Sequence, residues 1–150
     1  MLAAKLTHLT LPVTDLVASV QFYQYYAGLN IIHQYCDTST EQQIVWLSDS
    51  STDFILVLVE SQAFFPVLAP FANLGVTCSS AAQFELLCTQ AHRSARLIGA
   101  PKAPHPPFGY RAKLRDPDGH ILELMLNTNV PPAVIAPNSL LAQNPVHSYV

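Results

Sequence analysis

Apolar and polar residues alternate at the start of the chain, over residues 5–13. In an extended strand, one side would carry the apolar residues Leu9, Leu11 and Val13. The opposite side would carry His8, Thr10 and Pro12. This alternation predicts a strand with one face packed on helices and the other face toward a polar surrounding.

The next segments complete a first half. Thr14 or Asp15 can cap a helix that runs through Tyr26, and Gly28 is a suitable stop. Apolar runs bounded by polar turns then predict strands at residues 29–35, 44–47 and 54–59. The first half is therefore predicted to be β-α-β-β-β.

The pattern repeats after residues 61–72, which hold two prolines, show no clear period and are predicted to be a linker. A strand is expected at 74–78 and a helix from Ser79 or Ser80 to about residue 97, ended by Gly99. Residues 101–107 are predicted to be a loop, and strands are expected at 110–115 and 120–126 around an Asp-Pro-Asp-Gly turn. The first hairpin strand of this half is poorly defined. We expect one domain at residues 1–127, with halves at about 5–60 and 73–126, and a proline-containing tail at 128–150.

Composition narrows the class of protein. Half of the 150 residues are apolar, 11% are charged and the net charge is −3, which argues against disorder and against nucleic-acid binding. No apolar run reaches the roughly 18 residues of a membrane span, and residues 1–5 lack a signal peptide's apolar run. Cys36, Cys78 and Cys88 form no CxxC pair, which predicts free thiols in a reducing cytoplasm. So little charge on so apolar a chain favours a homodimer.

Two segments resemble the vicinal oxygen chelate superfamily, which includes glyoxalases, bleomycin-resistance proteins and extradiol dioxygenases. They are Leu-Thr-His-Leu-Thr-Leu-Pro-Val-Thr-Asp-Leu at residues 6–16 and Arg-Asp-Pro-Asp-Gly-His-Ile-Leu-Glu-Leu at residues 115–124. Ser19, Phe22-Tyr23 and Gly28-Leu29 also match, so the resemblance covers about residues 5–126. It implies an α+β fold in which two βαβββ modules form a curved mixed sheet around a cleft.

The resemblance also implies a metal site on strand positions that face the cleft. His8 matches the first ligand and Glu123 the last, and Glu123 is the candidate catalytic residue. The ligand position on the fourth strand falls near Val57, which cannot coordinate, and the second-module position falls on Asn73, a weak ligand better suited to Mg or Mn than to Zn.

A His8–Asn73–Glu123 set implies one divalent ion, Zn, Ni, Mn or Fe, and a protein without metal is the alternative. The departures at Val57 and Asn73 weaken a dioxygenase, which needs two His and one carboxylate, and also a four-ligand isomerase. His33, His105 and His120 are weaker substitutes, and His120 is expected to face away from the cleft.

Further residues are candidates for contacts with a small-molecule ligand. They are Trp46, Val57, Phe108, Tyr110 and Arg111, with Arg115 as an alternative to Arg111. Trp46 is the only tryptophan and is more often a core residue than a ligand platform.

Three functions remain open at this point. One is a glyoxalase-like lyase or isomerase with an altered metal site, and another is a metal-free binding protein that sequesters an apolar or cationic drug, as bleomycin-resistance proteins do. The third, thiol transfer of the fosfomycin-resistance type, is disfavoured by the missing second-module His and by the expected lack of a basic phosphonate pocket.

Overall fold

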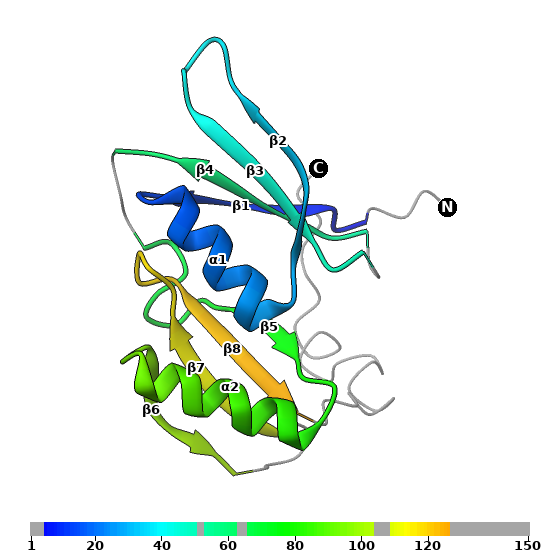
Figure 1. Ribbon diagram of the computed structural model, residues 1–150, viewed down its shortest axis with the longest axis vertical. Helices are drawn as coiled ribbons and strands as arrows, with labels where there is room; N and C mark the ends of the chain where they lie inside the picture. Colours follow the sequence, from blue (N-terminus) through cyan, green and yellow to red (C-terminus); the bar gives the residue numbers. More distant parts are fainter. Residues whose placement is uncertain (1–4, 51–52, 63–65, 104–108, 127–150) are drawn as a thin grey trace, which may run out of the picture.

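The strands and helices form two halves of the same order (Figure 1). The computed structural model describes residues 5–50, 53–62, 66–103 and 109–126. The first half contains β1 (His8–Val13), α1 (Leu16–Ala27), β2 (Asn30–Cys36), β3 (Gln43–Ser48) and β4 (Ile55–Glu60). The second contains β5 (Leu74–Thr77), α2 (Ala81–Arg93), β6 (Leu97–Lys102), β7 (Tyr110–Arg115) and β8 (Ile121–Leu126).

Each half builds its own four-stranded mixed sheet. The orders are β1-β4-β3-β2 and β5-β8-β7-β6, and in each sheet the first pair is parallel while the other pairs are antiparallel. A parallel pair needs a long crossover, which α1 and α2 begin in their halves. The α+β fold with two βαβββ modules is therefore confirmed.

Local chemistry sets the ends of α1. The Asp15 side chain accepts a hydrogen bond of 2.9 Å from the backbone N–H of Ala18, as expected of an N-cap residue. Gly28 follows in the left-handed conformation at φ 66°, where its N–H donates to the carbonyl of Tyr23. Both predicted boundaries of this helix are confirmed.

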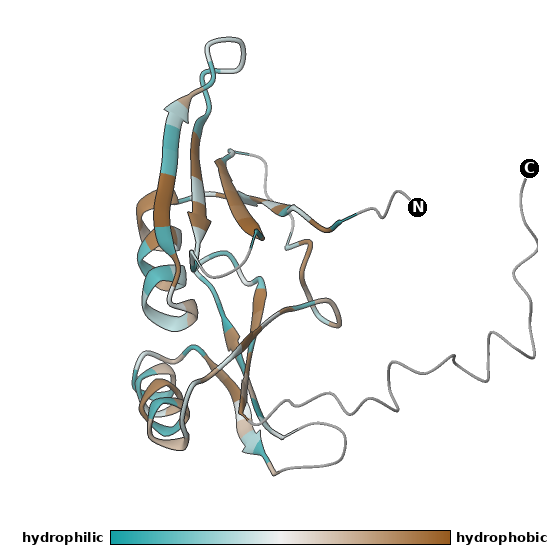
Figure 2. Cartoon of the chain, turned by 90° about the vertical axis from the view of Figure 1, so that its right-hand side faces the viewer, coloured by the Kyte–Doolittle hydropathy of each residue, from teal (hydrophilic) through white to brown (hydrophobic). Residues whose placement is uncertain are grey.

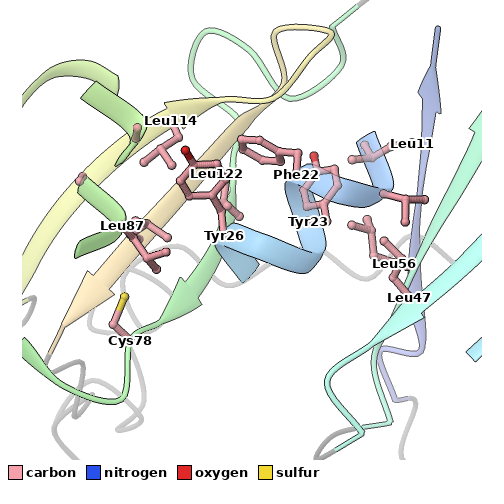
Figure 3. Packing of buried hydrophobic residues seen from close by; sticks show 14 of the residues in the cluster. Leu11, Phe22, Tyr23, Tyr26, Leu47, Leu56, Cys78, Leu87, Leu114 and Leu122 are labelled. Atoms are coloured by element: carbon pink, nitrogen blue, oxygen red, sulfur yellow. The ribbon is translucent and has the colours of Figure 1, made fainter. Parts of the chain in front are cut away.

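The core extends through both halves because α1 packs against each of them. In Figure 3, Phe22, Tyr23 and Tyr26 lie between Leu11, Leu47 and Leu56 on one side and Leu114 and Leu122 on the other. The guanidinium of Arg96 lies 5.4 Å from the centre of the Phe22 ring. The Tyr26 hydroxyl is 3.3 Å from the Ser94 hydroxyl.

Polar groups also join the halves, in what we term the inter-half network: the buried Tyr23, Asp116 and His120 and the half-buried Asp118. The Tyr23 hydroxyl donates to Asp116 Oδ2 over 2.9 Å, and Asp116 Oδ1 accepts from the N–H groups of Asp118 and His120. Asp118 in turn accepts from the backbone and hydroxyl of Thr14. Burial raises the pKa of the Tyr23 phenol, and nearby Asp116 raises it further.

The end of α2 differs from the prediction. The helix ends at Arg93, and Leu97 already begins β6, so the poorly defined strand lies partly inside the segment that we expected to be helix and loop. Gly99 does not stop a helix. It sits within β6 at φ +69°, where the pairing with β7 shifts register.

The two helices lie on the same side of the chain, one above the other (Figure 2). Within the described ranges, no helix has the length and apolar character to cross a membrane. All three cysteines are free thiols, as predicted, with Cys36 exposed and Cys78 and Cys88 buried.

Candidate functional site

Strand alternation gives the first sheet two different faces. Its helix-facing side carries Leu11, Val13, Leu56 and Leu58, each at most 1% exposed. The opposite side bears a cavity of about 330 Å³, termed here the Trp46 cavity. Its lining is Thr7, His8, Thr10, Tyr35, Ile44, Trp46, Ile55, Val57 and Val59. The volume lies within the range of small-molecule sites, and the lining is mainly apolar with a few polar groups.

Backbone pairing brings the cavity residues together. Val57 on β4 pairs with Thr10 on β1 and with Trp46 on β3. His33 on β2 is the cross-strand partner of Trp46, and their rings meet edge to face with centres 5.4 Å apart. His8 Nδ1 is 2.9 Å from the Thr7 hydroxyl. In the part of the chain that the structure describes, the buried Trp46 Nε1 has no hydrogen-bond partner.

The second sheet has a charged face. On β8, Leu122 and Leu124 are fully buried toward the helix side, so Glu123 falls on the opposite side. There it lines a small cavity of about 80 Å³, the Glu123 pocket, together with Ile98, Ala100, Lys102, Arg111, Ala112 and Lys113. Arg111 Nη1 lies 3.9 Å from Glu123 Oε1, with side chains 29% and 13% exposed.

The remaining predicted ligand contacts are dispersed. Tyr110 precedes Arg111 and so falls on the opposite side of β7, where it lines a separate cavity of about 670 Å³ beside α2. Asn73 immediately precedes β5 and is half-buried. Phe108 lies outside the described residues. The structure thus groups His8, Trp46 and Val57 on one sheet, and Arg111 and Glu123 on the other.

The three histidines considered as substitutes have different places. His33 lies beside Trp46, close to the cavity. His105 lies outside the described residues. His120 is fully buried, with Nδ1 accepting from the N–H of Leu68 over 3.3 Å and Nε2 lying 3.1 Å from the Pro12 carbonyl. Because Nδ1 accepts a hydrogen bond and Nε2 lies beside a carbonyl, the ring proton is on Nε2. His120 lines neither the Trp46 cavity nor the Glu123 pocket.

The family implies a divalent metal, so the donors need to be compared with such a site. His8 is the single imidazole, carboxylate or thiolate in the Trp46 cavity lining. Glu123 shares its pocket with three cationic side chains, which repel a divalent cation. Over the described ranges, no cluster of three or more His, Cys, Asp or Glu residues could hold a metal ion. The donors of one chain therefore do not fit the site that the family implies.

Sequence reasoning missed Lys102 and Lys113 as residues of a basic pocket. The two-residue spacing of Arg111, Lys113 and Arg115 is the signal that could have found it, because a strand places such residues on one face. Lys102 was hidden in a segment predicted to be loop.

These features define a βαβββ-repeat domain with a ligand-sized cavity, and comparison with known proteins gives the family. A family model of the Glyoxalase/Bleomycin resistance protein/Dioxygenase superfamily matches residues 5–124, and the chain belongs to this superfamily. Uncharacterized protein PA2024 of Pseudomonas aeruginosa is 33% identical over 121 residues, which cover 79% of this chain and 85% of that protein.

Two solved structures illustrate the fold. TnmS3, an antibiotic-binding protein from a Streptomyces species, is 21% identical with a TM-score of 0.61, over 84% of this chain and 98% of its own. The fosfomycin resistance protein FosX from Listeria monocytogenes, in a mutant form complexed with Mn(II) and a dihydroxypropylphosphonic acid, is 15% identical with a TM-score of 0.66, over 89% of this chain and 99% of its own.

Proposed function

We propose that this chain is a small-molecule-binding protein that takes an apolar, aromatic ligand in the Trp46 cavity and needs no metal to do so. The observation that carries the proposal is the composition of that cavity, in which the indole and four aliphatic side chains face His8 and Thr10 as polar anchors. The likeness to an antibiotic-binding protein lends support at the level of the fold.

Trp46 is the only tryptophan, so its fluorescence reports on this cavity alone. We expect one or more members of a panel of planar aromatic compounds to change that fluorescence saturably and to raise the melting temperature. A ligand at 100 times its Kd adds about 2.7 kcal/mol to the free energy of unfolding. The metal chelator EDTA should leave binding unchanged.

A matched pair of substitutions locates the ligand. Val57→Ala removes two methyl groups from the cavity wall and should weaken binding by roughly 15-fold, at about 0.8 kcal/mol for each buried methyl-sized group. Val67→Ala makes the same change at a site that is 54% exposed and outside the cavity, and should have no effect. Binding that is equally insensitive to both changes would place the ligand elsewhere.

A lyase or isomerase with an altered metal site is the second candidate. The observation that favours it is the position of His8, which matches the first ligand and lines the cavity. This second candidate predicts that purified protein, after incubation with divalent metal, holds one equivalent of Mn, Ni, Zn or Fe. The His8→Ala variant should lose that metal. Metal at background level, with aromatic ligands still bound, rejects this candidate and leaves the first intact.

We further propose that the chain forms a homodimer. The edge strand β2 exposes Ile31, Ile32 and Tyr35 at 44%, 48% and 40%, and apolar side chains of this kind favour an interface. Sedimentation should therefore give twice the chain mass, and Ile32→Lys should shift it toward the monomer. A wild-type protein that sediments as a monomer at high concentration contradicts this.

A further inference from the structure

Positive charge is concentrated on one part of a chain whose net charge is negative. Of seven Lys and Arg residues, four lie on the adjacent strands β6 and β7, while the whole chain carries a net charge of −3. They are Lys102, Arg111, Lys113 and Arg115. The first three line the Glu123 pocket, so the concentration coincides with a cavity.

The single carboxylate of the pocket does not neutralise these cations. Lys113 is directly opposite Glu123 in the strand register, yet the ion pair that forms is the one between Glu123 and Arg111. At 3.9 Å this pair is too long to be a hydrogen bond. Within the described part of the chain, neither Lys102 nor Lys113 has an ion-pair partner. Three cations therefore surround one carboxylate in a partly buried pocket.

A partly buried excess of positive charge is unfavourable unless an anion joins it, because the local dielectric is lower than that of water. The cavity of about 80 Å³ has room for a small oxyanion, since it corresponds to roughly two to three waters at about 30 Å³ each. Guanidinium and ammonium groups are the side chains that bind carboxylate and phosphate oxygens most strongly.

We propose that the Glu123 pocket is an oxyanion site, in which Arg111 and Lys113 bind the carboxylate or phosphate group of a small molecule and Lys102 contributes from the rim. Glu123 holds the Arg111 side chain near the pocket and, by its own negative charge, keeps the affinity moderate. This site is separate from the Trp46 cavity, because the two share no lining residue.

The test is a titration followed by amide NMR at constant ionic strength, with inorganic phosphate and benzoate as probes and chloride as the reference anion. We expect saturable shifts at the amides of residues 111–113 and 123 with at least one probe, and the comparison of the two distinguishes a phosphate site from a carboxylate site. Shifts that are no larger than those with chloride overturn the proposal.

Substitutions test the charges one at a time. Lys113→Gln should weaken binding about tenfold, the usual effect of losing one charge-assisted hydrogen bond. Arg93→Gln, at the exposed end of α2, removes the same charge at a residue that does not line the pocket and should leave the affinity unchanged. Equal losses in the two variants would reveal only a general effect of net charge and would refute a defined site.

Glu123→Gln gives a result of opposite sign. Removing the competing carboxylate should tighten binding of the anion severalfold, whereas a metal site or a purely structural role predicts loss or no change. Trp46→Phe should leave phosphate and benzoate binding at the pocket intact. Failure of this proposal is thus distinguishable from failure of ligand binding in the Trp46 cavity.

Discussion

The hydrogen bond between Tyr23 and Asp116 joins the two halves, and Tyr23→Phe removes that bond alone. The donor and acceptor are 2.9 Å apart, and the residues are 1% and 3% exposed, so water cannot replace the lost hydroxyl. A hydrogen bond to a charged group contributes about 1.5–3 kcal/mol. Because Asp116 keeps its two backbone donors, we expect a loss of about 2 kcal/mol.

This loss should depend on pH with a definite sign. Burial raises the pKa of Asp116, while the electrostatic effect of His120 and the hydrogen bond from Tyr23 lower it. A raised folded-state pKa means that the stability contributed by this group is full below the ordinary carboxyl value of about 4 and is lost as the pH rises through the raised value. Removing the Tyr23 hydroxyl raises that pKa further, so the destabilisation should be larger at pH 7 than near pH 4.

Urea unfolding, followed by circular dichroism at both pH values, measures the effect. A loss of about 2 kcal/mol lowers the ratio of folded to unfolded protein roughly 30-fold and the melting temperature by about 4–8 °C for a chain of this size. Tyr25→Phe is the matched control, because it makes the same change on the same helix at a side chain that is 51% exposed. If the two variants have the same stability, the network does not hold the halves together as we have argued.

Three other predictions concern the thiols, a helix end and the buried histidine. Cys36 should react with a maleimide at pH 8 well before the other two thiols, because it is exposed. Burial and the nearby Cys78 raise the pKa of Cys88 to about 11, and burial also raises the pKa of Cys78. Mass spectrometry of partly labelled protein checks the order, and early labelling of Cys88 would contradict it. Gly28→Ala should cost about 1 kcal/mol in urea unfolding through its φ of +66° alone, since nothing lies within 4 Å of the added Cβ, and a neutral result would refute the strain. His120→Ala should cost about 2–4 kcal/mol, since His120 is fully buried and both of its ring nitrogens have backbone partners, and a wild-type melting temperature would disprove that role.

Much of the fold could be predicted because several strands alternate, over most of their length, between more and less buried positions. Within residues 9–13 and 122–126 every second side chain is the more buried one, and the helix between Asp15 and Gly28 has a cap at each end. The strand β6 could not be predicted in the same way, because it contains Gly99 and Pro101 and its burial does not alternate. Four of its six residues are exposed, so the sequence has no need for an apolar residue at every second position.

The candidate site was predictable in part for the same reason. Alternation correctly separates Glu123 and Arg111 from the helix-facing leucines, and it places His8, Trp46 and Val57 on one open face. Sequence alone could not show which open face each residue shares, because the pairing of eight strands into two sheets depends on contacts that are distant along the chain. The role of Asp116 was hidden for a similar reason, since its partner Tyr23 is 93 positions away.

The uneven distribution of charge has a kinetic consequence. A basic face on an acidic molecule attracts anions from a distance, so encounters at the Glu123 pocket should be fast at low ionic strength and slow as added salt shortens the Debye length toward about 8 Å. The mainly apolar Trp46 cavity has no such field to guide its ligand. The association rate at the Glu123 pocket should therefore fall with added salt more steeply than the rate at the Trp46 cavity, even where the equilibrium occupancies are the same.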